Sequence, residues 1–82
     1  MKLPVIKHLQ KNNSNEALQH TIDVLESFTE HRSVSDAEMD VIGELITNLC
    51  GAVEMHEMIA GGMSERDAAN GFAQKVLGSI DR

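Results

Sequence analysis

The side chains of this sequence that could do chemistry gather in one stretch, residues 49–62. It contains the only cysteine of the chain, Cys50, together with His56 and Glu57. A cysteine thiolate can act as a nucleophile or redox group, and imidazole and carboxylate groups can bind a metal ion or transfer a proton. Whether these groups meet in one site depends on the element that carries them.

That element is predicted to be one long helix. Hydrophobic residues recur at spacings of three and four over residues 36–60, which is the period of an amphipathic helix. Ser35 followed by Glu38 forms a capping-box pattern at its start, and Gly61 and Gly62 mark its end. At 1.5 Å per residue this helix would be about 37 Å long, so we expect it to be the central element of the fold.

On such a helix the possible chelating groups point in different directions. His56 falls inside the hydrophobic arc, whereas Glu54 lies about 200° around the helix from it. Helical di-metal sites use a glutamate three residues before the histidine, and here that position is occupied by Val53. We therefore expect no metal site, no cofactor and no catalytic residue.

Structural roles are favoured for both the histidine and the cysteine. We expect His56 to be buried or half-buried and hydrogen-bonded to a neighbouring helix, for example to a Ser, Thr or Asn side chain, with a pH-sensitive contact as the alternative. Cys50 borders the hydrophobic seam and is expected to be buried as a small hydrophobe. The carboxylates of Glu54 and Glu57 would raise the pKa of its thiol and so disfavour a reactive thiolate.

One resemblance suggests a different function for this stretch. The segment "CGAVEMHEMIAGGMSERDA" resembles the helix that carries Cys-x-x-Cys-x-x-x-His in the carboxymuconolactone decarboxylase and alkylhydroperoxidase-D family. Cys50 matches the first cysteine, but Val53 replaces the resolving cysteine, Glu57 stands at the histidine position, and His56 is one residue early. A dithiol cycle needs the second thiol. The alternative function that this resemblance implies is a thiol-redox accessory protein or enzyme that uses Cys50 and His56.

Composition limits the partners and the location. Thirteen acidic and seven basic residues give a formal net charge of −6, and the chain has no Trp or Tyr, so nucleic acid is an unfavourable partner. A single cysteine cannot form a disulfide within the chain. The sequence has neither a signal peptide nor a run of about 20 apolar residues, so we expect a cytoplasmic protein without membrane contact.

The whole chain, residues 1–82, is predicted to form one domain. Turn and capping signals divide it into helices. The predicted helices cover residues 4–12, 15–30, 36–60 and 65–79. The short turns between them favour antiparallel neighbours, so the predicted fold is all-α: a small antiparallel bundle of about four helices around the long central one. A chain of this length buries only about 60–65% of its unfolded surface, which favours a dimer.

A second face of the central helix has small residues and methionines at a spacing of four. This face comprises Gly43, Thr47, Gly51 and Met55, with Met58 close by. Each glycine inside a helix costs about 1 kcal/mol relative to alanine, and small residues on such a ridge let another helix approach closely. We expect these residues to form an interface, either with a second copy or with another cytosolic protein. Neutral exposed surface is the alternative.

A further resemblance covers most of the chain. The segments "MKLPVIKHL", "DVIGELI" followed by "GAVEMHEM", and "VLGSID" resemble a family of short, uncharacterised, all-α bacterial proteins. The resemblance implies a complete small protein and carries over no activity. Size, charge and the missing catalytic groups together favour a non-enzymatic, acidic helical module for protein–protein interaction or homodimerisation.

Overall fold

A computed structural model describes the backbone of residues 2–80 and the side chains of residues 2–75. Four helices make up this part of the chain: α1 (Leu3–Asn12), α2 (Asn15–Thr29), α3 (Asp36–Ala60) and α4 (Glu65–Ile80). No strand occurs between residues 2 and 80. The predicted all-α class and the four helices are confirmed.

Serine side chains begin three of these helices. The Ser14 hydroxyl accepts a hydrogen bond from the Ala17 amide at the start of α2, and Ser64 accepts one from the amide of Asp67 at the start of α4. At the start of α3, Ser35 and Glu38 form the complete reciprocal capping box that the sequence predicted. Each cap satisfies backbone donors that the first turn of a helix leaves without a partner.

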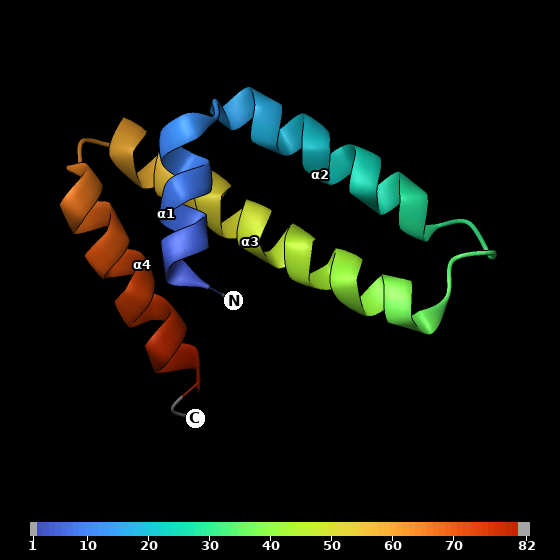
Figure 1. Ribbon diagram of the computed structural model, residues 1–82. Coiled ribbons are helices and arrows are strands. Elements are labelled where there is room, and N and C mark those ends of the chain that lie inside the picture. The colour runs from blue at the N-terminus through green and yellow to red at the C-terminus, as the bar shows by residue number, and fades with distance from the viewer. Residues whose placement is uncertain (1, 81–82) are drawn as a thin grey trace.

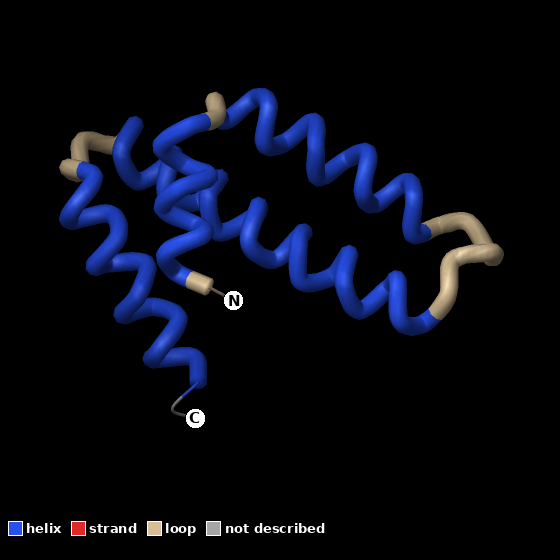
Figure 2. Tube along the Cα trace, in the orientation of Figure 1, coloured by secondary structure: helices blue, strands red, loops and turns tan. Residues whose placement is uncertain are grey.

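The longest helix, α3, contacts all three others. Figure 1 shows α2 and α3 running antiparallel beside each other, whereas α1 crosses α3 and α4 leaves its far end at an angle. Short turns connect the helices (Figure 2). The helices therefore do not form the regular antiparallel bundle that the short turns suggested, and the molecule is a flat body of 42 × 32 × 17 Å.

The hydrophobic core lies where the C-terminal half of α3 meets the other helices. Its buried residues are Ile6, Leu18, Leu49, Ala52, Met55, Ala69 and Phe72. Gly51 is at its centre, because a Cβ atom added there would lie 2.9 Å from Cζ of Phe72 and 3.0 Å from Cδ1 of Ile6. Only glycine lets α1 and α4 approach α3 this closely without a shift of those side chains.

Some residues of the face that was expected to form an interface are buried in the structure, and others are exposed. Gly51 and Met55 are buried inside the chain, with Met55 only 1% exposed, and Met58 is partly buried against the same core. Gly43 and Thr47 are exposed, and no atom lies within 4 Å of a Cβ added to Gly43. The close approach at Gly51 is made by helices of the same chain. Met55 is not available at the surface for the interface that was expected to include it.

Candidate functional site

The three residues considered for redox chemistry do not form one site. Cys50 is exposed, which contradicts its expected burial. It lies about 100° around α3 from the buried residue Leu49. Glu57 is also exposed, and Glu54 forms an ion pair with Lys75 of α4. Among the described residues, no group of three or more His, Cys, Asp or Glu side chains is placed to hold a metal ion.

The surroundings of Cys50 disfavour a thiolate. Partial burial raises the pKa of the Cys50 thiol, and the carboxylate of Glu26 on α2 raises it further. The direction of this pKa shift agrees with the sequence-based expectation, but its causes are partial burial and, after it, Glu26, and not Glu54 or Glu57. At neutral pH the thiol is therefore protonated and a weak nucleophile.

Cys50 should consequently react with iodoacetamide at pH 7.5 more slowly than a cysteine in an unfolded peptide. The rate should rise with pH over a range above the ordinary thiol titration, because the raised pKa delays ionisation. Mass spectrometry of timed samples measures both rates. The variant Cys50→Ser should keep the helical content and the mass of the wild type in solution. Reaction faster than that of the peptide would contradict this assignment and restore the redox alternative.

His56 has a positioning role at the junction of α1 and α3. It is half-buried, as expected, and its Nε2 lies 2.7 Å from the backbone oxygen of Asn13, at the end of α1. Because a carbonyl oxygen only accepts, Nε2 carries the hydrogen and donates it. The partner is thus a main-chain group and not the side chain that was considered. The bond holds the last turn of α1 against α3.

The other end of α1 is fixed at Asn48. The backbone amide of Lys2 donates to Oδ1 of Asn48 at 3.0 Å, which gives this buried side chain a partner. Since α1 begins beside Asn48 and ends beside His56, it covers only the C-terminal half of α3. The same side of α3 continues before residue 48 without α1 over it.

Hydrophobic side chains occupy this uncovered region. We call it the apolar face; it consists of Val24 and Phe28 on α2 and Val41 and Leu45 on α3, with Val5 of α1 at its edge. The four residues on α2 and α3 are between 48% and 68% exposed. Each pair is spaced by four residues, so its two side chains lie on one side of their helix.

Two hollows follow the groove between α2 and α3 along the apolar face. The first has a volume of 410 Å³ and is lined by Phe28, Ala37, Glu38, Val41 and Ile42. The second, of 340 Å³, reaches α1 and is lined by Val5, Leu9, Thr21, Leu25, Leu45, Asn48 and Leu49. Both linings are mainly hydrophobic, and neither includes Cys50 or His56. The arrangement is suited to apolar contact and offers no acid–base pair.

The fold and this surface define a small all-helical protein with an open apolar face. Comparison with known families is more specific: a model described as a family of unknown function (DUF6952) matches residues 1–81. The chain therefore belongs to that family, which confirms the resemblance to uncharacterised proteins. No curated protein and no solved structure matches the chain. None of the helices in the described part of the chain is both long and apolar enough to cross a membrane.

Proposed function

We propose that this protein is a non-enzymatic homodimerisation module of the cytoplasm, in which the apolar faces of two copies pack together. The observation that carries this proposal is that the exposed hydrophobic residues Phe28, Val41 and Leu45 line the groove between α2 and α3. Val24, also exposed, lies one helical turn before Phe28 on α2. A contiguous exposed apolar surface rimmed by polar residues is typical of an interaction site.

The open shape of the chain supports a second copy as the partner. Its radius of gyration is 13.7 Å, whereas about 12 Å is expected for a compact chain of this length. Stable domains usually contain two packed layers of secondary structure, but α1 covers only the C-terminal half of α3, so the N-terminal half of α3 and its neighbour α2 form a single layer. A second chain related by a two-fold axis would supply another layer there.

The amount of exposed surface is also what a dimer needs. The accessible surface is 5731 Å², compared with about 4,850 Å² expected for a compact monomer of 9.0 kDa. The excess, about 900 Å², is close to the roughly 800 Å² that each partner buries in a standard interface. Glu38 is the only charged residue that lines the hollows among the described side chains, and Ser35 donates two hydrogen bonds to its carboxylate.

Introducing a charge at the centre of the apolar face should separate the dimer. We expect the wild type to have twice its chain mass of 9.0 kDa at micromolar concentration. Leu45→Glu and Val41→Asp should each weaken self-association by about 100-fold or more, because the new carboxylate would be buried without a partner. Sedimentation equilibrium measures the masses, and circular dichroism verifies that both variants remain helical.

Met63→Glu is the matched control. Met63 is 38% exposed, similar to Leu45, but it lies in the turn between α3 and α4 and not on the apolar face. This variant should remain dimeric. A wild type that stays at 9.0 kDa up to millimolar concentration would contradict homodimerisation, and so would equal weakening by the control.

A further inference from the structure

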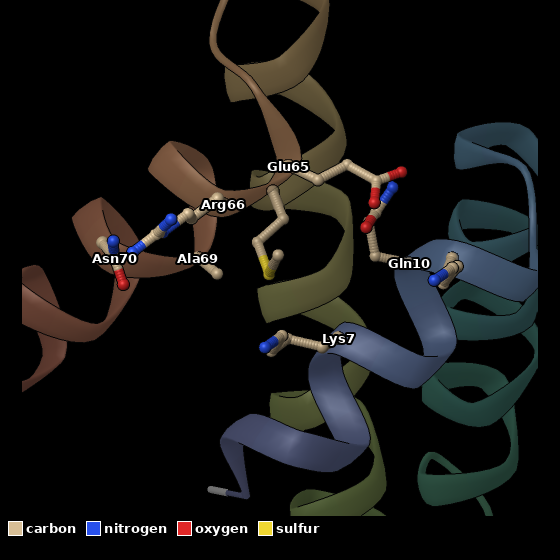
Figure 3. Close-up of a pocket in the computed structure, with 8 residues that line it drawn as sticks. Lys7, Gln10, Glu65, Arg66, Ala69 and Asn70 are labelled. Atoms are coloured by element: carbon tan, nitrogen blue, oxygen red, sulfur yellow. The ribbon is translucent and has the colours of Figure 1, made fainter.

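A third hollow lies away from the apolar face, where α1, α3 and α4 meet. Its volume is 290 Å³, and its lining includes Lys7, Gln10 and Lys11 of α1, Met55 of α3, and Arg66 and Asn70 of α4. Figure 3 shows Lys7 extending from α1 toward α4, which carries Arg66, Ala69 and Asn70. Residues from both ends of the sequence thus form one pocket.

The charge of this pocket is opposite to that of the protein. The chain has only seven basic residues and a net charge of −6, yet three cations, Lys7, Lys11 and Arg66, line this one hollow. None of the three has an ion pair with another described residue. Glu65 is the only acidic residue of the lining, so the pocket carries a net charge of about +2.

The side chain of Gln10 adds a neutral amide group to this lining. Gln10 is only 8% exposed and lines the pocket, and its side chain makes no hydrogen bond within the described part of the chain. None of the described side chains has a polar atom that is both buried and without a hydrogen-bond partner, so the amide group of Gln10 is open to solvent. A ligand in the pocket can replace water as the hydrogen-bond partner of this amide.

The pocket also lies at the start of α4. Glu65 and Arg66 are the first two residues of this helix, where the helix dipole places partial positive charge. Met55 and Ala69 add apolar surface to the same lining. The site therefore combines cationic donors for an anionic group with a hydrophobic wall for an uncharged part.

We propose that this pocket binds a small organic phosphate monoester. Its phosphate would lie among Lys7, Lys11 and Arg66 and accept a hydrogen bond from the Gln10 amide, and its organic part would contact Met55 and Ala69. At neutral pH a phosphate monoester has a charge of about −1.5 to −2, which balances the net charge of the lining. A pocket of 290 Å³ is near the lower end of the range for small-molecule sites, about 300 to 1,000 Å³, so the ligand is small.

Titration with phenyl phosphate tests this proposal. Amide signals of isotope-labelled wild type should show saturable shifts at Lys7, Lys11 and Arg66, with a dissociation constant of about 1 mM or lower at constant ionic strength. Inorganic phosphate should bind at the same residues but more weakly, because it lacks the apolar part. Benzoate, a monoanion with the same ring, should bind at least about tenfold more weakly than phenyl phosphate.

Single-charge variants supply the control. Lys7→Gln and Arg66→Gln should each weaken phenyl phosphate binding by about tenfold or more, because each removes a charge-assisted hydrogen bond. Arg32→Gln removes an exposed cation from the turn between α2 and α3 and should leave the dissociation constant unchanged. Absence of saturable shifts, equal affinity for benzoate, or equal weakening by Arg32→Gln would each overturn the proposal.

Discussion

Replacing Gly51 with leucine is expected to destabilise the protein by about 1–3 kcal/mol, although leucine is the better helix former. A Cβ atom at this position would lie 2.9 Å from Cζ of Phe72 and 3.0 Å from Cδ1 of Ile6, so a larger side chain must displace these buried side chains or the helices that carry them. For a domain of this size each kcal/mol lowers the melting temperature by roughly 4–8 °C. Thermal unfolding at fixed protein concentration measures the change.

Gly43→Leu is the matched control on the same helix. Nothing lies within 4 Å of a Cβ atom at Gly43, which is exposed. Leucine there should raise the stability of α3 by up to about 1 kcal/mol through helix propensity alone. The two substitutions are thus expected to differ in sign. A melting temperature that rises in Gly51→Leu as well would show that α1 and α4 do not pack closely on α3.

Truncating Phe72 to alanine should have the largest effect on stability, about 3–5 kcal/mol. Phe72 is 3% exposed, and its ring lies against Gly51, so its removal leaves a cavity between α3 and α4. A chain of this length has a total stability of roughly 4–12 kcal/mol, so a large part of it would be lost. Urea unfolding followed by circular dichroism gives the free energy of unfolding.

A second phenylalanine provides the comparison. Phe28 is 51% exposed and lies on the apolar face. In the Leu45→Glu background, where the chain is expected to be monomeric, Phe28→Ala should lower the free energy of unfolding by less than about 1 kcal/mol. Equal losses for Phe72→Ala and Phe28→Ala in that background would contradict the placement of the core.

Features set by neighbouring residues could be predicted from the sequence. The capping box of Ser35 and Glu38 and the caps at Ser14 and Ser64 depend on contacts over three residues, and the sequence shows both partners. The end of α3 is similar: Gly62 has a φ of 110°, a backbone conformation that other residues rarely adopt. Local chemistry of this kind does not depend on how the helices pack.

The exposure of individual residues on α3 could not be predicted, because periodicity gives the faces of a helix but not which neighbour covers each face. Gly51 was expected at an interface with another chain, and the sequence alone did not indicate that α1 and α4 of the same chain pack against it. Cys50 was expected to be buried and is exposed for the same reason. The partner of His56 is a backbone oxygen, which no pattern of side chains indicates.

The unequal lengths of the predicted helices could have indicated that part of the central helix stays uncovered. The first helix has 10 residues and the central helix has 25, so the first can cover less than half of it. Hydrophobic residues beyond that reach, Val41 and Leu45, must then be covered by α2, by solvent or by another chain. The structure places both at the edge of the groove beside α2, with about half of each side chain exposed.

The most direct test of homodimerisation through this face is an isotope-filtered nuclear Overhauser experiment on a mixture of labelled and unlabelled chains. It detects only contacts between different copies. We expect contacts between subunits from the methyl groups of Val24, Val41 and Leu45, and none from the methyl groups of the buried Ile6 and Met55. A dimeric sample without contacts from Val41 and Leu45, or with contacts only at other residues, would contradict the proposed interface.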